Sequence, residues 1–274
     1  MLMASLSESI EPQPFSSQQI AFFEENGYLS GPRVFSDDQV DELKSRIDDL
    51  ITGRVDFPQH LKAGGDLASA KIVNLYRHDA VFAAIDHTPM GTLANDLMTA
   101  PVRLWEDQMI MKVPHEGDAA LAWHQDCAFW DYVAPAELVT CWIALDDAAV
   151  ANGCMHVVPG SHRWDLDYHR DELPADDPDW LLNHPDIPAG ACVEPVPCEV
   201  KAGHCHFHHC RTLHGSYGST TASLRRSYVL HLLPGNTRRI GQPWNSRMAQ
   251  MHDIADGALV EGPDFPVLPC SASV

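Results

Sequence analysis

Apolar residues recur at helical spacing near the start of the chain. Ser17 can cap a helix that runs to about Asn26, and Gly27 directly after it is a typical C-terminal stop. Ser36 and Gln39 then form a capping-box pattern, which predicts the start of a second helix. The apolar residues on one face of that helix are Val40, Leu43, Ile47, Leu50 and Ile51. The first part of the chain therefore predicts a layer of helices.

A third helix follows, and then the pattern changes. Thr88-Pro89 begins this helix, which runs to about Thr99, because proline suits the first helical turn and threonine can cap it. From residue 101 onward, short segments rich in Val, Ile, Trp and Thr alternate with turn-forming residues, as is typical of strands. The predicted strands span 102–113, 138–145, 154–158, 193–199, 204–210 and 225–233. An irregular, Asp- and Pro-rich insertion at 165–191 is too long for a hairpin loop.

These patterns favour an α+β, mainly β fold. The helices would pack on one sheet of an antiparallel double-sheet barrel, since closing or doubling a sheet protects its edges. The chain has 274 residues, 45% of them hydrophobic, so it can bury one substantial core and does not require a second. We therefore expect a single domain over residues 1–274, with residues 1–15 flexible and the 165–191 insertion near the active site.

The chain is strongly acidic. Lys and Arg number 18 against 38 Asp and Glu, which gives a formal charge of −20. The electrostatic field of so negative a protein repels nucleic-acid phosphates and anionic membrane surfaces, so neither is an expected partner. We expect a small-molecule substrate instead, and the sequence does not indicate an oligomeric state.

The sequence shows neither an export signal nor a membrane span. The first residues include acidic residues and proline, not a basic segment followed by an apolar run. No apolar stretch reaches transmembrane length. The 8 cysteines are scattered without a repeating framework, so we expect reduced thiols. Together these features predict a cytoplasmic protein.

The segment Trp123-His124-Gln125-Asp126 is the most informative for chemistry. On an extended strand, residues i and i+2 point to the same side, so His124 and Asp126 can present an imidazole and a carboxylate together. Two histidines and one carboxylate on one face of an octahedral iron leave the opposite positions open for an oxo acid and dioxygen. The alternative interpretation is a solvated polar pair, and a third ligand is needed to distinguish the two.

The histidine-rich segment G-H-C-H-F-H-H-C-R-T-L-H-G-S offers several candidates for that ligand. We favour His214, because it precedes a turn at 215–221 and Arg225 follows at the start of the next strand. Hairpin geometry would then return the guanidinium to the neighbourhood of the metal. His206 and His208 remain alternatives, because they share the parity of His214 on an alternating strand.

An arginine near the metal would complete such a site. A 2-oxo acid that binds iron through its keto and C1 carboxylate oxygens carries its second carboxylate several ångströms away, where a planar guanidinium can bind it through two hydrogen bonds. Arg225 and Arg226 are adjacent, so at most one of them faces inward on a strand, and parity does not decide which. Ser216 could add a hydroxyl to the same anchor.

Four motifs, in this order, resemble one known family. They are W-H-Q-D, C-W-I-A-L-D-D, N-G-C-M-H-V-V-P-G-S-H, and L-H-G-S with R-R eleven residues after its histidine. Over roughly residues 18–235 the chain resembles the phytanoyl-CoA dioxygenase family, which includes the ectoine hydroxylases. The resemblance implies a double-stranded β-helix, or cupin-like jelly roll, that uses Fe(II), 2-oxoglutarate and O2. It also implies oxidative decarboxylation to succinate and CO2, coupled to hydroxylation of a substrate.

The resemblance assigns roles residue by residue. It makes His124, Asp126 and His214 the iron ligands and Arg225 the clamp for 2-oxoglutarate. The residues it suggests around 2-oxoglutarate are Ser216, Trp142 and, only by its distance before the iron motif, Lys71. The residues expected in the substrate pocket are Trp130 and its neighbour Phe129. No catalytic side chain is expected beyond the iron site.

We therefore predict hydroxylation of an unactivated C–H bond of a small metabolite or natural-product intermediate. Cys127-Ala128-Phe129 replaces the acidic loop of the ectoine-type enzymes, which argues against ectoine as the substrate. Desaturation, epoxidation and ring closure use the same oxidant and remain alternatives.

Two further classes of protein remain open as well. One is a cupin-like metal-binding module without turnover. The other is a zinc-dependent hydrolase built on the histidines and cysteines of 204–210, although that segment lacks the spaced ligand pairs of structural zinc sites.

Overall fold

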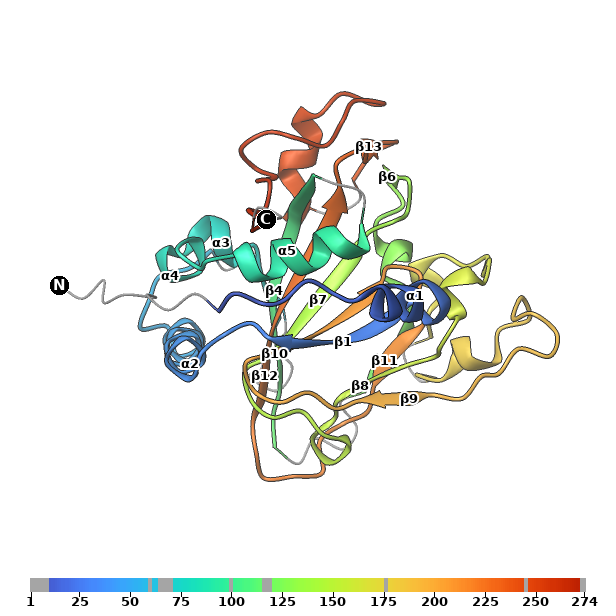
Figure 1. The fold of residues 1–274 in the computed structure, drawn as a ribbon, viewed down its shortest axis with the longest axis horizontal. Helices are drawn as coiled ribbons and strands as arrows, with labels where there is room; N and C mark the ends of the chain where they lie inside the picture. Colours follow the sequence, from blue (N-terminus) through green and yellow to red (C-terminus); the bar gives the residue numbers. More distant parts are fainter. Residues whose placement is uncertain are drawn as a thin grey trace.

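Two antiparallel sheets form the centre of the molecule (Figure 1). The computed structural model describes residues 10–58, 61–63, 71–98, 101–114, 120–174, 177–243 and 246–271. The larger sheet contains, in spatial order, β1 (Tyr28–Arg33), β10 (His204–His209), β7 (Val139–Ala144), β12 (Arg225–Pro234), β4 (Val102–Lys112), β3 (Lys71–Val73) and β2 (Lys62–Ala63). The smaller sheet contains β5 (Leu121–His124), β11 (His214–Ser216), β8 (Met155–Val157) and β9 (Val196–Cys198). A short pair joins β13 (Arg238–Arg239) to β6 (Val133–Ala134). The predicted double-sheet architecture is confirmed.

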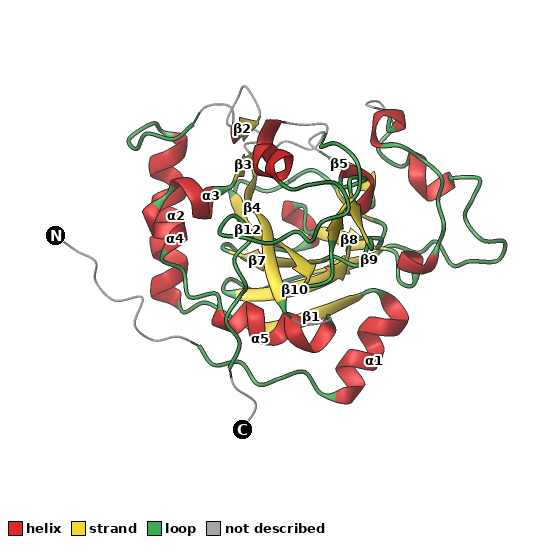
Figure 2. Ribbon diagram, turned by 90° about the horizontal axis from the view of Figure 1, so that it is seen from above, coloured by secondary structure: helices red, strands yellow, loops and turns green. Residues whose placement is uncertain are grey.

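Helices pack against the outer face of the larger sheet (Figures 1 and 2). They are α1 (Ser17–Asn26), α2 (Asp37–Ile51), α3 (Leu75–His78), α4 (Ala80–Ala83) and α5 (Thr88–Leu97). On α2 the predicted apolar face is buried, and Leu43 and Ile47 share one hydrophobic core with Tyr228 and Leu230 of β12. This confirms the expected helical layer on one sheet. None of the described helices is long and apolar enough to cross a membrane.

Side chains along β12 alternate between that core and the space between the two sheets. Tyr228 and Leu230 pack under the helices, whereas Val229 and His231 line a cavity on the other side. This is the alternation expected of a strand with period two. It places polar side chains of the larger sheet opposite the smaller sheet, where the candidate metal ligands lie.

The 165–191 insertion folds against the smaller sheet. It contains the short 3-10 helices η6 (Arg170–Glu172) and η7 (Trp180–Asn183). Leu181 is fully buried in a hydrophobic cluster that also contains Trp123 of β5. The insertion is thus packed onto the strand that carries His124.

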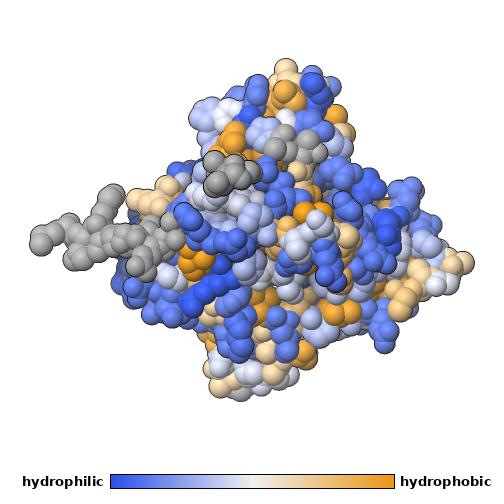
Figure 3. Space-filling model, viewed as in Figure 1, coloured by the Kyte–Doolittle hydropathy of each residue, from blue (hydrophilic) through white to orange (hydrophobic). Residues whose placement is uncertain are grey.

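The face of the molecule seen in Figure 3 is mainly hydrophilic. Figure 3 shows hydrophilic residues over much of the visible face, with hydrophobic ones scattered between them. Among the residues that the structure describes, the exposed large hydrophobic ones come from separate parts of the sequence: Phe22, Leu121, Val150, Tyr217, Ile240 and Val267. Exposed apolar residues of this kind are ordinary for a folded protein.

The predicted boundaries of the first two helices need one correction. Ser16, not Ser17, is the N-cap of α1, and its hydroxyl accepts a 3.3 Å hydrogen bond from the backbone N–H of Gln19. The side chain of Gln19 bonds the Ser16 backbone in return, so the capping box starts one residue earlier than predicted. Gly27 ends the helix in the left-handed region at φ 76°, and the capping box at Ser36 is present, as predicted.

The third helix begins at Thr88-Pro89, as predicted, but its cap differs from the prediction. Thr88 is already helical and His87 precedes it without a capping bond from its side chain, so threonine is not the cap. The helix ends at Leu97, and Thr99, the predicted end, lies outside the described residues. Of the start expected to be flexible, residues 1–9 also lie outside the described residues, while Phe15 is buried against the core.

Two neighbouring phenylalanines test which face of α1 is buried. Phe23→Ala should lower the free energy of unfolding by about 3–5 kcal/mol, because Phe23 is only 6% exposed. Phe22→Ala should lower it by at most about 1 kcal/mol, because Phe22 is 40% exposed and its ring lies 5.4 Å from that of Tyr28 at the surface. Chemical denaturation followed by circular dichroism measures both, and equal losses would contradict the assigned face.

Candidate metal centre

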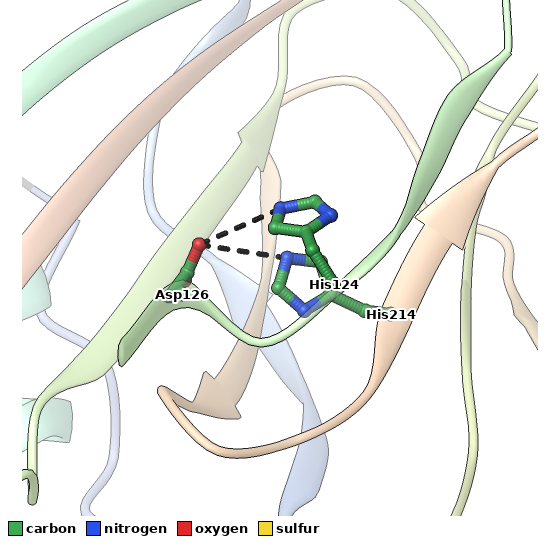
Figure 4. A group of neighbouring side chains, drawn as sticks. All are labelled: His124, Asp126 and His214. Atoms are coloured by element: carbon green, nitrogen blue, oxygen red, sulfur yellow. Dashed lines mark ion pairs between the residues drawn. The ribbon is translucent and has the colours of Figure 1, made fainter. Parts of the chain in front are cut away.

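Three side chains from neighbouring elements converge between the sheets (Figure 4). His124 ends β5, Asp126 begins the 3-10 helix η3 (Asp126–Phe129), and His214 begins β11. His124 and His214 are direct partners in the antiparallel pairing of β5 with β11. Their Nε2 atoms lie 3.7 and 3.6 Å from Asp126 Oδ1, and the three ligand atoms all lie within 4.8 Å of one another. The group has the size and donor atoms of a site for one metal ion.

The two histidines are oriented for metal binding. Nδ1 of His124 is 2.8 Å from the carbonyl oxygen of Ala122, and Nδ1 of His214 is 2.8 Å from that of Thr212. Nδ1–H therefore donates to the backbone in both residues, which leaves the lone pair of Nε2 directed at Asp126 and available to a cation. The donor set thus fits a divalent metal.

The charges at the centre also suit a cation. Burial lowers the pKa of His124, and it lowers the pKa of His214 well below its usual value. Both imidazoles are therefore neutral near pH 7. Burial also opposes the charge on Asp126, but the surrounding His214 and His208 outweigh this effect and hold the pKa of the carboxyl well below its usual range. Two neutral imidazoles and one carboxylate result.

The other histidines of β10 lie beside this group. His208 Nε2 is 3.3 Å from Asp126 Oδ2, the second carboxylate oxygen. The His206 ring lies farther off, 5.8 Å from the His208 ring, and stacks on Tyr28. Cys205 is on the opposite side of the strand in the hydrophobic core. Within the described part of the chain, the zinc cluster considered for 204–210 does not form, and the one metal-sized group is that of His214.

A cavity of about 450 Å³ opens beside the metal-sized group. Its wall includes all three candidate ligands and side chains from both sheets. The polar residues around it include Lys71, Gln108, Lys112, Thr140, Ser216 and Arg225. The apolar ones include Ile110, Leu121, Phe129, Trp130, Trp142 and Val229. A largely apolar pocket with a few placed polar groups is typical of a small-molecule site.

Arg225, not Arg226, faces this cavity. Arg225 is 2% exposed, its guanidinium lies 5.3 Å from the centre of the Trp142 ring, and its Nε has no hydrogen-bond partner in the described part of the chain. Burial lowers its pKa to about 10, so it remains charged at pH 7. Arg226 instead pairs with Asp146 at 2.9 Å and Asp48 at 3.0 Å. A buried cation that lines a cavity requires an anion, and a carboxylate of 2-oxoglutarate fits this requirement.

The predicted hairpin between His214 and Arg225 was wrong. The strand that contains His214 continues to Ser216, so the turn starts later than residue 215. This strand belongs to the smaller sheet, whereas β12 with Arg225 belongs to the larger one. The connection crosses between the sheets, and Arg225 reaches the cavity from the side opposite His214.

The other residues expected at the site also line the cavity. They are Ser216 on β11, Trp142 on β7, Lys71 on β3, and Phe129 and Trp130 at the end of η3. The Phe129 ring lies 5.7 Å from the His124 ring, and the Trp130 ring lies 4.7 Å from that of His231. Each of them is therefore within the same pocket as the candidate ligands.

Several cavity residues were missed from the sequence. Lys112 is the register partner of Arg225 on β4, and its Nζ donates a 2.7 Å hydrogen bond to the carbonyl oxygen of Tyr217. Glu106 and Gln108 lie on the same side of β4 as Lys112. Period-two parity along the predicted strand 102–113 could have grouped these residues, but it could not show that their side faces a cavity.

The insertion fixes the strand around His124. Trp123 donates from Nε1 to Asp179 Oδ1 at 3.0 Å, and Gln125 donates from its backbone N–H to the Tyr168 hydroxyl at 2.8 Å. Both neighbours of His124 are therefore held by the insertion. Leu173 of the same segment lines the cavity.

Comparison with known proteins was consistent with this site. The family model of phytanoyl-CoA dioxygenase (PhyH) matches residues 23–227. L-proline trans-4-hydroxylase of Streptomyces griseoviridis is 34% identical over 140 residues, which cover 50% of this chain and 51% of that enzyme, so the match spans about half of each. Phytanoyl-CoA dioxygenase domain-containing protein 1 of Mus musculus is 25% identical over 264 residues, which cover 80% of this chain and 90% of that protein.

Solved structures show the same fold. The non-haem alpha-ketoglutarate-dependent carbocyclase SnoK from nogalamycin biosynthesis superposes with a TM-score of 0.73 at 26% identity, over 92% of this chain and 96% of SnoK. EctD from S. alaskensis, solved with 2-oxoglutarate and 5-hydroxyectoine, superposes with a TM-score of 0.72 at 20% identity, over 97% of this chain and 90% of EctD. The predicted jelly-roll fold is confirmed.

Metal affinity tests the choice of His214. His214→Ala should weaken Co(II) binding by more than roughly 100-fold, because loss of a direct ligand exceeds the 10–100-fold typical of outer-shell changes. His206→Ala, a matched control that removes a buried histidine beside His208, should change the Kd by less than about 3-fold. Anaerobic calorimetric titration measures both. Retained affinity in His214→Ala, with loss in His206→Ala or His208→Ala, would show that the ligand is wrongly assigned.

Proposed function

The chain belongs to the phytanoyl-CoA dioxygenase family, and on this premise we propose that it hydroxylates an unactivated C–H bond of a small metabolite or natural-product intermediate. Members of the family and the structural neighbours are iron- and 2-oxoglutarate-dependent dioxygenases, so the protein is an enzyme of this class. Its cofactor is Fe(II), and its cosubstrates are 2-oxoglutarate and O2. The substrate and the bond that is oxidised are the proposed part.

The observation that carries the proposal is the presence of two complementary features in one cavity. His124, Asp126 and His214 would hold the iron, and Arg225 would bind the distal carboxylate of 2-oxoglutarate. Ser216 could donate a hydroxyl hydrogen bond to the same carboxylate, and Trp142 covers the guanidinium. When bound, iron and 2-oxoglutarate supply the oxidation, in which one oxygen atom of O2 goes to the substrate and the other to succinate as CO2 is released.

The protein itself would orient the substrate and exclude water. Phe129 and Trp130 line the cavity next to the candidate ligands, and Leu173 adds an apolar contact from the insertion. Apolar walls of this kind position a C–H bond by shape, because such a bond offers no strong hydrogen bond to recognise. We therefore assign Phe129 and Trp130 to the substrate side and Arg225 to the cosubstrate side.

The named relatives support a small substrate. Their names specify L-proline for the Streptomyces enzyme and nogalamycin biosynthesis for SnoK. A cavity of about 450 Å³ is within the range of small-molecule sites. Hydroxylation is the reaction we favour, and the carbocyclase SnoK is the reason to include ring closure in the product analysis.

The buried cation argues against the two other classes of protein. Arg225 is 2% exposed, and its Nε has no hydrogen-bond partner among the residues that the structure describes. An uncompensated buried charge is destabilising, and neither a metal-binding module without turnover nor a zinc-dependent hydrolase needs such a charge in the cavity. Succinate release discriminates between the classes. The enzyme should convert 2-oxoglutarate to succinate with Fe(II) and O2, and a panel of small metabolites screened by mass spectrometry should include one that gains an oxygen atom. Absence of succinate from an iron-loaded, folded protein would exclude the proposal.

The adjacent arginines provide a matched pair for the cosubstrate site. Arg225→Ala should weaken binding of 2-oxoglutarate to the Co(II)-loaded protein by about 10–100-fold, because charge-assisted hydrogen bonds of about 1.5–3 kcal/mol are lost. Arg226→Ala should change the Kd by less than about 3-fold, since Arg226 contacts Asp146 and Asp48 instead of the cavity. Calorimetry under anaerobic conditions measures both, and the reverse ranking would overturn the assignment of the clamp.

A further inference from the structure

The two oxygens of Asp126 have different neighbours. Oδ1 is the oxygen nearest to Nε2 of His124 and Nε2 of His214, at 3.7 and 3.6 Å. Oδ2 accepts a 2.7 Å hydrogen bond from the hydroxyl of Thr140 and lies 3.3 Å from His208 Nε2. One carboxylate oxygen therefore faces the candidate metal site, and the other contacts polar side chains of the larger sheet.

Thr140 is the first member of a hydrogen-bond network of buried side chains. Its Oγ1 is 2.9 Å from Nδ1 of His231, and Nε2 of His231 contacts the side-chain amide of Gln108. Thr140, His231 and Gln108 are 1%, 4% and 4% exposed. They lie on β7, β12 and β4, which are neighbours in the larger sheet, and Thr140 and His231 are direct register partners. The sheet itself brings the three side chains into line.

The direction of each hydrogen bond in this network follows from the donors and acceptors at its two ends. A carboxylate oxygen without a proton only accepts, so the Thr140 hydroxyl must donate to Asp126. The hydroxyl oxygen of Thr140 must then accept from Nδ1–H of His231. The amide nitrogen of Gln108 carries only N–H groups, so it donates and His231 Nε2 accepts. Every link allows one direction only.

We propose that Thr140, His231 and Gln108 are positioning residues that hold Asp126 so that Oδ1 alone is presented to the metal. The proposal rests on the proposed function in one respect, namely that Asp126 is a metal ligand. Without the Thr140 hydroxyl the carboxylate would be free to turn about its terminal bond and would present a different oxygen or both. Outer-shell hydrogen bonds to ligands are known to set ligand orientation and metal affinity.

Packing in the cavity supports this role. The Trp130 ring lies edge-on to His231 at 4.7 Å and fixes the plane of the imidazole. Gln108, Thr140 and His231 all line the cavity, so the network runs along its wall from β4 to the metal-sized group. The adjacent inward residues Ile110 and Val229 show that apolar side chains are accommodated on the same side of these strands. Apolar side chains can therefore fill inward positions on these strands, so packing alone does not explain three hydrogen-bonded polar side chains in a row.

Conservative changes at Thr140 test the proposal. Thr140→Val keeps the shape and removes the hydroxyl, and it should weaken anaerobic Co(II) binding by about 10-fold or more and change the visible d–d spectrum of the bound metal. Thr140→Ser restores a hydroxyl and should stay within about 3-fold of the wild type with the wild-type spectrum. Thermal melting of the metal-free variants controls for folding. Wild-type affinity and spectrum in a folded Thr140→Val would overturn the proposal.

A second variant covers failure of Thr140→Val to fold. Gln108→Met removes the last hydrogen bond of the network, the one to His231. It should weaken Co(II) binding by roughly 2- to 10-fold and alter the same spectrum, because His231 loses its fixed partner. An unchanged Kd for Co(II) and an unchanged spectrum in folded Gln108→Met would contradict the proposed role of the hydrogen-bond network. Failure of the proposed function looks different, because in that case the wild type itself would not bind Co(II), or His214→Ala would bind it equally well.

Discussion

The structure buries one negative charge, that of Asp126, between its two sheets, and this charge has to be compensated. A buried carboxylate is strongly destabilised unless polar or charged groups surround it. Here the smaller sheet contributes His124 and His214 and the larger sheet contributes Thr140 and His208, so both sheets meet at this charge. A divalent cation would complete the compensation. The metal site and the closure of the two sheets are thus parts of the same arrangement.

A second buried charge of opposite sign gives the cavity its polarity. Arg225 enters from the larger sheet and lines the cavity that also contains His214 on the smaller sheet. The two charges are not neutralised by each other, because no ion pair joins Arg225 to Asp126 in the described part of the chain. Such a cavity suits a ligand with a metal-chelating end and a distant carboxylate, which describes 2-oxoglutarate. The family assignment and the local physical chemistry therefore agree.

Local sequence patterns predicted the grouping of His124, Asp126 and His214 better than the path of the chain between them. The His-x-Asp pair lies together as expected, because Gln125 is extended, at φ −111° and ψ 130°, before the 3-10 helix begins. The spacing from His214 to Arg225 suggested a hairpin, but spacing alone does not reveal that a connection crosses between sheets. Thr140 and His231 were missed because parity groups residues on one side of a strand without showing what that side faces.

The central claim is that iron and 2-oxoglutarate bind together in this cavity. The most direct measurement is the visible metal-to-ligand charge-transfer band on anaerobic addition of 2-oxoglutarate to the Fe(II)-loaded protein, with Asp126→Ala as the control. The account predicts a band in the wild type, produced when the oxo acid chelates the iron, and none in Asp126→Ala. A folded, iron-loaded wild type that shows no band, or a variant that shows the full band, would contradict it.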